Sequence, residues 1–320
     1  MVVLLLGVTV TAEANAPVKK DFKRSGRVFG SIFTGLEFLP ENEETNKEFV
    51  LDRLEIGYIY HFSENWLVKG CFDVTNPKDN GELKHSAFSR NAFAEYHNDK
   101  LILRFGMITG ISFNFVEKCW GHRYIAKSYQ EYFDYSASRD IGITGSYQAT
   151  RTIKLDWIVS NGEGYKSQQN DNAFEYGIGA TITPFKGWVF RTYADYSNSK
   201  DVVEDTYAFM AGYQFKNGNS VGAEYNRQRN AKVTAGQCQH GCSFYTTIRL
   251  TPKMHIYGRY DYNDRAKTWD DGDNVHAVFA GLEFRPVKGI KIAPNYVLNT
   301  HTVGDVSTVN EYRISCEFKF

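Results

Sequence analysis

The sequence predicts an all-β protein, a transmembrane antiparallel up-and-down β-barrel of 16 strands. Three observations predict this fold. Apolar and polar residues alternate with a period of two along many segments, as in strands that face lipid on one side and water on the other. Short and long polar connections alternate along the chain, which is typical of barrels with short periplasmic turns and longer external loops. The chain also ends with such a strand, and its last residue is Phe320.

The composition agrees with this fold. The formal net charge of zero gives no reason to expect a nucleic-acid partner. Aromatic residues make up 15% of the chain, including 21 Tyr and 23 Phe, enough to supply aromatic girdles at two membrane interfaces. The mean hydropathy is −0.44, and no run of 18 apolar residues occurs beyond the N-terminus. This excludes a bundle of membrane-spanning helices.

Residues 1–16 are expected to form a signal peptide, and residues 17–320 a single barrel domain. Residues 2–10 are an apolar run, followed by the small-residue cleavage sites A-E-A and A-N-A. Because Pro17 would obstruct cleavage directly before it, a cut after Ala14 is favoured. No Lys or Arg precedes the apolar run, and a short buried helix or strand is the alternative.

The last strand, residues 310–320, shows the alternation most clearly. Tyr312 and Ile314 face one side of an extended chain, and Glu311 and Arg313 face the other. In a closed barrel this strand would pair with the first, which removes the free edge of the sheet. An ordinary edge strand that ends in Phe by chance is the alternative reading.

The same period places the other strands. They are expected at residues 28–38, 50–62, 66–74, 84–97, 101–109, 139–147, 153–160, 173–183, 188–197, 205–215, 220–228, 242–250, 254–262, 274–285 and 290–299. Without the two weakest, the fourth and the eleventh, the barrel would have 14 strands.

One predicted loop, residues 110–138, is much longer than the others and rich in aromatic and charged residues. A loop of this length that is not low-complexity is usually functional. If this third long loop folds into the lumen, it narrows the pore. A surface loop that covers the mouth of the barrel is the alternative.

Five cysteines in a chain of this length do not indicate a disulfide framework. Cys238 and Cys242 are expected in a loop, on either side of a Gln-His-Gly segment. Two thiols and His240 provide only three metal ligands, so a loop disulfide or two unpaired thiols is favoured over a metal site.

Two segments resemble a known family. F-V-E-K-C-W-G-H-R-Y-I-A-K-S-Y (residues 115–129) and S-R-D-I-G-I (138–143) resemble the third-loop region of the phosphate-selective porins, where R-D-I-G opens the strand after the constriction loop. V-S-N-G-E-G-Y (159–165) resembles that family's strand-end motif. The resemblance implies a 16-stranded barrel, commonly trimeric, that passes small anions by diffusion. The phosphate-selective members carry surplus Arg and Lys along the lumen, and here this sequence departs from them.

The polar faces of the predicted strands carry charges of both signs. The candidate lumen-facing residues are Arg53, Lys69, Asp73, Arg104, Lys154, Asp156, Arg191, Asp195, Arg249, Arg259 and Asp261. Four pairs lie on one face of one strand and are expected to neutralise each other: Lys69 with Asp73, Lys154 with Asp156, Arg191 with Asp195, and Arg259 with Asp261. A lumen of this kind should not strongly prefer one sign of ion, because selectivity needs a ring of like charge. The same pairs could equally serve only to stabilise the wall.

The third loop supplies the candidate constriction residues Glu117, Lys118, His122, Arg123, Lys127 and Glu131. If Lys118, Arg123 and Lys127 point into the channel, a mild local preference for anions follows.

The sequence as a whole predicts a porin of the bacterial outer membrane, through which small hydrophilic solutes or ions, with anions one candidate class, diffuse passively. The expected partners are membrane lipid, these solutes and two further copies in a homotrimer. No catalytic residues, cofactor or metal are expected, because the histidines on strands stand alone and no nucleophile or phosphate-binding motif occurs. A non-conducting barrel that acts in adhesion or membrane assembly through its external loops is the alternative.

Overall fold

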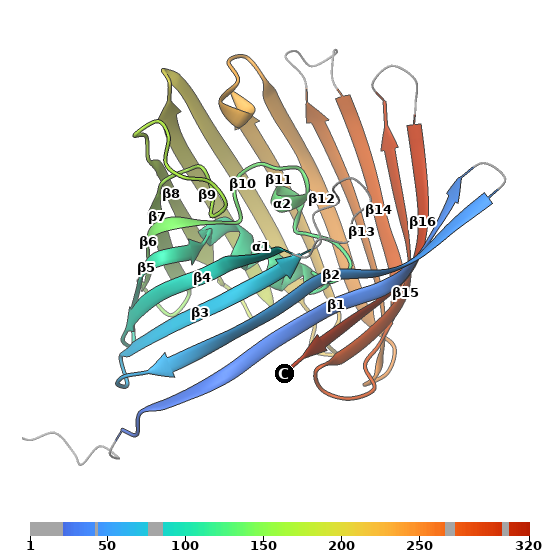
Figure 1. Cartoon of the computed structure of the whole chain (residues 1–320), viewed down its shortest axis with the longest axis horizontal. Coiled ribbons are helices and arrows are strands. Elements are labelled where there is room, and N and C mark those ends of the chain that lie inside the picture. Colours follow the sequence, from blue (N-terminus) through green and yellow to red (C-terminus); the bar gives the residue numbers. More distant parts are fainter. Residues whose placement is uncertain (1–21, 42–43, 76–85, 266–272, 303–306) are drawn as a thin grey trace, which may run out of the picture.

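The protein is described here by a computed structural model, for residues 22–41, 44–75, 86–265, 273–302 and 307–320. Sixteen strands form one closed antiparallel barrel, in which each strand pairs with its neighbours in sequence and β1 pairs with β16 (Figure 1). The predicted fold class and strand number are therefore confirmed, and the 14-strand alternative is wrong. The predicted signal peptide lies outside the described residues.

The strands are β1 (Ser25–Glu41), β2 (Glu44–His61), β3 (Trp66–Thr75), β4 (Ser86–His97), β5 (Leu101–Thr109), β6 (Arg139–Gln148), β7 (Ile153–Ser160), β8 (Glu175–Ile182), β9 (Trp188–Ser199), β10 (Val202–Gln214), β11 (Ser220–Arg229), β12 (Cys238–Arg249), β13 (Met254–Arg265), β14 (Asp273–Phe284), β15 (Ile290–His301) and β16 (Ser307–Lys319). Two helices, α1 (Ile111–Trp120) and α2 (Tyr129–Tyr132), follow β5. A single 3₁₀ turn, Ala231–Val233, precedes β12. No helix in these described ranges is long and apolar enough to cross a membrane.

The pairing of β1 with β16 closes the barrel, with Ser31 opposite Lys319 and Phe38 opposite Tyr312. Tyr312 is 53% exposed on the outer face, whereas Glu311 is buried on the inner face. The predicted alternation of this last strand is confirmed.

Two bulges shift the alternation in the N-terminal strands. The first lies at Asp52 in β2, where Arg53 pairs with Phe33 but Leu51 pairs with Thr34. The second lies at Arg90 in β4. Because a bulge adds one residue, the side chains beyond it change faces. Phe49, beyond the first bulge, is consequently 84% exposed on the outside.

Cys238 and Cys242 lie on β12, so their predicted loop placement is wrong. Four residues along a strand span roughly 13 Å, which is beyond the reach of a disulfide. Both thiols are free, and among the described residues no group of three or more His, Cys, Asp or Glu is arranged to hold a metal ion.

The third loop, residues 110–138, folds into the barrel, where α1 and α2 lie inside the ring of strands (Figure 1). Val116, Trp120 and Tyr124 of the loop form one buried cluster with Tyr245 and Tyr257 of the wall. Helix α1 ends at Gly121, whose φ of 73° is the left-handed conformation that favours glycine, and whose N–H donates to the carbonyl of Glu117. The alternative of a surface loop over the mouth is wrong.

Candidate functional site

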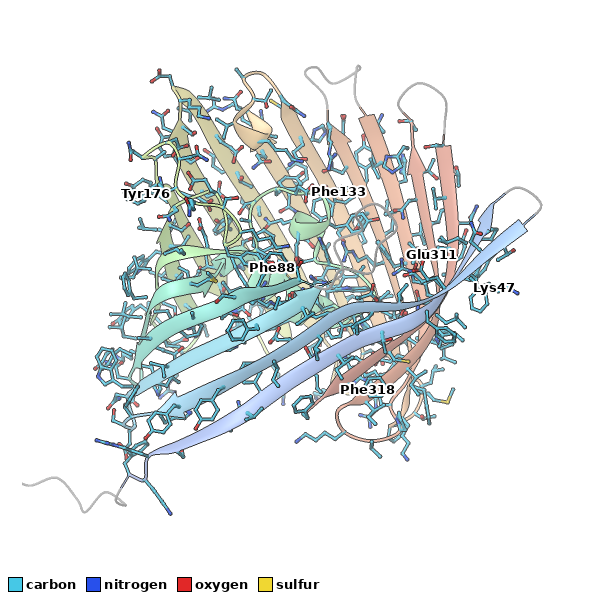
Figure 2. All side chains as sticks on the ribbon, in the orientation of Figure 1. Lys47, Phe88, Phe133, Tyr176, Glu311 and Phe318 are labelled. Carbon is cyan, nitrogen blue, oxygen red and sulfur yellow. The ribbon has the colours of Figure 1, made fainter. Side chains whose placement is uncertain are left out.

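The third loop is fastened to the inner wall formed by β11, β13, β14 and β15. Several side-chain hydrogen bonds join the two, and four of them reach different strands: Tyr124 O–H donates to Glu283 (2.7 Å), Tyr129 O–H to Asn263 (2.8 Å), Gln130 N–H to Asn226 (2.6 Å) and Tyr132 O–H to Asn299 (2.7 Å). The four acceptors lie on four different strands. The loop therefore cannot shift as a unit without breaking several bonds at once. Figure 2 shows Phe133 of the loop inside the barrel.

A passage remains between the loop and strands β1 to β6 and β16, and at one end it also reaches Phe279 of β14 and Val297 of β15. It consists of two adjoining hollows of about 230 Å³ and about 510 Å³. Phe33, Arg53 and Arg123 line both hollows, so the two adjoin at these side chains.

The charges along this passage are unequal. Nine basic residues line it: Arg53, Lys69, Arg90, Arg123, Lys127, Arg139, Lys166, Arg313 and Lys319. Five acidic residues line it: Asp52, Glu55, Asp73, Glu117 and Glu131. Two of the nine, Arg313 and Lys319, are paired with Glu37 and Glu317 behind the lining. The surplus of positive charge that remains around this narrow space favours a positive potential.

Arginines on neighbouring strands hold the acidic side chains of the wall. Arg53 Nε lies 3.2 Å from Asp73 Oδ2, and Arg90 Nε lies 3.7 Å from the same oxygen. Arg90 also contacts Glu55 through its Nη1. Two arginines thus face two carboxylates, Asp73 and Glu55, and the charges of this group on the wall are balanced.

On the loop side, Arg123 bridges two carboxylates. Its Nε lies 3.2 Å from Glu117 Oε2 and its Nη2 lies 2.9 Å from Glu131 Oε1. Burial raises the pKa of Glu131, but attraction to Arg123 and Lys127 outweighs burial and holds the pKa below its usual value. Glu131 is therefore charged at neutral pH. Lys127 is exposed on the same side of the passage.

His122 does not line the passage, contrary to the prediction. Only 2% of its surface is exposed, and its ring stacks on Tyr257 with the centroids 4.4 Å apart. Its Nδ1 lies 2.8 Å from the carbonyl of Trp120, and its Nε2 lies 3.6 Å from Glu283. Burial lowers the pKa of His122 to about 4, so the ring is neutral at physiological pH.

Lys118 also lies away from the passage, although its candidate partners Arg123 and Lys127 line it. It lines a third hollow of about 190 Å³ on the other side of α1, against β5 to β9. Arg104, Lys154 and Arg191 line this hollow too. The three loop cations named from the sequence are therefore divided between two sides of one helix.

Of the four charge pairs expected within single strands, the structure forms one. Arg259 Nε donates to Asp261 at 2.8 Å, and the Arg259 guanidinium lies over the ring of Trp120. Asp73 pairs instead with Arg53 of β2. Asp156 accepts two hydrogen bonds of 2.8 Å from Arg191 of β9. Neither of these two pairs lies directly opposite in the strand register. Glu55 is the residue opposite Asp73, and Arg191 reaches Asp156 across the intervening strand β8, over Gly179, whose lack of a side chain leaves room for the contact.

The remaining wall candidates lie in different surroundings. Lys69 lies over the ring of Phe29 at 4.7 Å and lines the passage. Arg104 pairs with Glu95 at 2.6 Å. Asp195 is buried on the inner face of β9. Arg249 is exposed at the last residue of β12, next to the short turn.

Sequence reasoning missed Arg90 and Arg139, which are both buried and line the passage. Arg90 is the extra residue of a bulge, so a strict period of two could not assign it to a face. Arg139 opens β6 directly after the long loop, within the R-D-I-G motif, and this position was the available signal.

No protein-family model matches this chain, and no curated protein matches it in sequence. Several solved structures share its fold. One is an anion-selective porin from Comamonas acidovorans, with a TM-score of 0.71, 8% identity and coverage of 93% of this chain and 100% of that one. OmpT of Vibrio cholerae is similar as well, with a TM-score of 0.69, 11% identity and coverage of 95% of this chain and 100% of that one. So is OmpF of Salmonella typhi, with a TM-score of 0.69, 15% identity and coverage of 92% of this chain and 97% of that one. The resemblance to the phosphate-selective family finds no support among these comparisons and stays a prediction. What they establish is the fold, which is that of porins of the bacterial outer membrane.

Proposed function

We propose that this protein is a porin of the bacterial outer membrane that lets small hydrophilic solutes diffuse through it and favours small anions over cations. The observation that carries the proposal is the passage beside the third loop, which nine basic and five acidic residues line. A channel selects ions by the charge at its narrow part, and the loop narrows the lumen here. The charges of the lumen as a whole were expected to be balanced, but this passage lies beside the loop, where the lumen is narrow.

The basic residues of the passage differ in how firmly carboxylates hold them. Arg53, Arg90 and Arg123 form ion pairs with acidic neighbours. Lys69 lies against an aromatic ring, and Lys127 is exposed without an ion pair among the described residues. These two ammonium groups are free to attract a passing anion. Because an anion must also leave, weak attraction at several points suits transport better than one tight site.

The test is single-channel conductance of the refolded protein in a planar bilayer, with chloride alone and then with added inorganic phosphate. We expect steady open channels whose chloride current falls as phosphate competes. Stable channels that phosphate leaves unchanged would argue against phosphate as a solute while supporting a general porin. A folded barrel that passes no current would contradict the proposal and favour the alternative role in adhesion or assembly. We also expect a homotrimer, and crosslinking of the protein in vesicles tests this.

A further inference from the structure

The outer face of β8 to β12 carries an apolar hollow of about 650 Å³. Small side chains form its floor, namely Ala180, Ala211 and Ala223. Its rim consists of Ile182, Phe190, Phe209, Tyr225 and Phe244, which are between 39% and 54% exposed. Side chains on this face point away from the lumen, since the alternate residues Glu224 and Asn226 are buried inside.

One unpaired cation stands beside this hollow. Arg227 lies two residues beyond Tyr225 on the same face of β11, toward the longer connection to β12. It is exposed, and within the described residues its guanidinium has neither an ion pair nor a hydrogen bond. Its neighbour Arg229 differs, because it pairs with Asp205 at 2.5 Å. A free charge on the membrane-facing surface of a barrel is costly unless it lies at the interface and meets an opposite charge.

The level of Arg227 matches a membrane interface. Tyr207 lies directly opposite it in the register of β10 and is 47% exposed. Tyrosines at this position are typical of the aromatic girdle where acyl chains meet head groups. From Arg227 to Ala223 the strand spans roughly 13 Å, a length that an acyl chain covers as it descends from a head group.

We propose that this surface binds one anionic membrane lipid, with its phosphate on Arg227 and an acyl chain in the hollow over Ala211 and Ala223. The charge of Arg227 selects a lipid that bears a net negative phosphate group, since a zwitterionic head group carries its own cation. The rim of aromatic side chains holds the chain in one place, where a flat barrel wall would let it move freely.

Native mass spectrometry of the refolded protein in detergent tests this, with phosphatidylglycerol and phosphatidylcholine as the probes. We expect one phosphatidylglycerol to remain bound and phosphatidylcholine to bind more weakly. Arg227→Gln should weaken phosphatidylglycerol binding roughly tenfold, the size expected for a charge-assisted hydrogen bond. Ala223→Phe fills the hollow and should weaken both lipids. Both positions face lipid, so neither change disturbs the interior.

Lys47→Gln is the matched control. Lys47 is exposed on the outer face of β2, on the hairpin of β1 and β2 that projects beyond the barrel (Figure 2), and it lines none of the four hollows described above. We expect this variant to bind lipid as the unmodified protein does. Equal binding of both lipids, or an Arg227→Gln variant that retains its lipid, would overturn the proposal. A shift from trimer to monomer in Ala223→Phe would also overturn it and assign the hollow to contact with a second copy.

The inference rests on the membrane placement in the proposed function, but the two fail separately. A channel that conducts ions and binds no phosphatidylglycerol would contradict only the lipid site. A barrel that binds the lipid and passes no current would contradict only the proposed porin function.

Discussion

The hydroxyl of Tyr124 in the third loop donates a 2.7 Å hydrogen bond to the carboxylate of Glu283 on β14, across 159 residues of sequence. Glu283 is fully buried, and Lys291 and Arg285 also contact it. This bond fixes the inner loop to the far wall and so keeps the passage open on the near side.

Removal of that bond should loosen the loop. Tyr124→Phe leaves one oxygen of a buried carboxylate with fewer donors, at an expected cost of about 1–3 kcal/mol. We expect a lower unfolding temperature and a noisier open-channel current. Tyr312→Phe, which loses a hydroxyl on the outer face, is the control and should behave like the unmodified protein. Equal noise in both variants would show that the loop does not depend on this bond.

Acidification should weaken the loop through His122. Its folded pKa is lowered to about 4 by burial, against about 6.5 when unfolded, so the unfolded chain binds the proton more readily. This contribution to stability is therefore complete above about pH 6.5 and is lost as the pH falls toward 4, by on the order of 3 kcal/mol. Thermal unfolding measured between pH 7 and 4 checks this. In His122→Gln the unfolding temperature should fall less steeply as the pH is lowered. An unchanged dependence on pH would contradict the role assigned to His122.

Loss of the Asp156 carboxylate should destabilise the barrel strongly. Arg191 is 6% exposed, forms two hydrogen bonds with Asp156, and also donates to the carbonyl of Ile111 at the start of α1. Asp156→Asn leaves a buried guanidinium without its counter-charge, at an expected cost of about 3–5 kcal/mol. Unfolding in a chemical denaturant measures this loss of stability.

Asp195→Asn is the control for that change, because Asp195 is similarly buried and forms no ion pair among the described residues. Asp195→Asn should lower the free energy of unfolding much less than Asp156→Asn does. Similar costs for the two variants would mean that the pair with Arg191 contributes little.

Oxidation should not link Cys238 to Cys242. Because both lie on β12 about four residues apart, a thiol-reactive label should add to each of them in the unfolded protein, with and without a reducing agent. Mass spectrometry counts the labels. Two fewer labels without the reducing agent would contradict the strand assignment.

The sequence was sufficient to predict the barrel because period-two alternation is local. It assigned Arg53, Asp73 and Arg191 to the inner face from their strands alone, and the structure agrees. Alternation fails at bulges, since an extra residue such as Arg90 leaves no trace in the pattern of its neighbours.

The partners of the inner charges were harder to predict. Asp156 pairs with Arg191 of β9 rather than with Lys154, because Gly179 on the intervening strand β8 leaves room for the arginine to reach across. The third loop posed the same problem on a larger scale. Nothing local shows that Tyr124 bonds β14 while Arg123, one residue earlier, faces the opposite side. His122 is buried because this part of the loop packs against the same wall, beside Glu283 and Tyr257.

The most direct test of the anion preference is the reversal potential of a single channel across a KCl gradient. The unmodified protein should be anion-selective, and the double variant Lys69→Gln with Lys127→Gln should lose most of that preference because both cations line the passage. Lys118→Gln, which removes a loop cation on the other side of α1, should change the potential much less. A reversal potential near zero in the unmodified protein, or an equal effect of Lys118→Gln, would contradict the account.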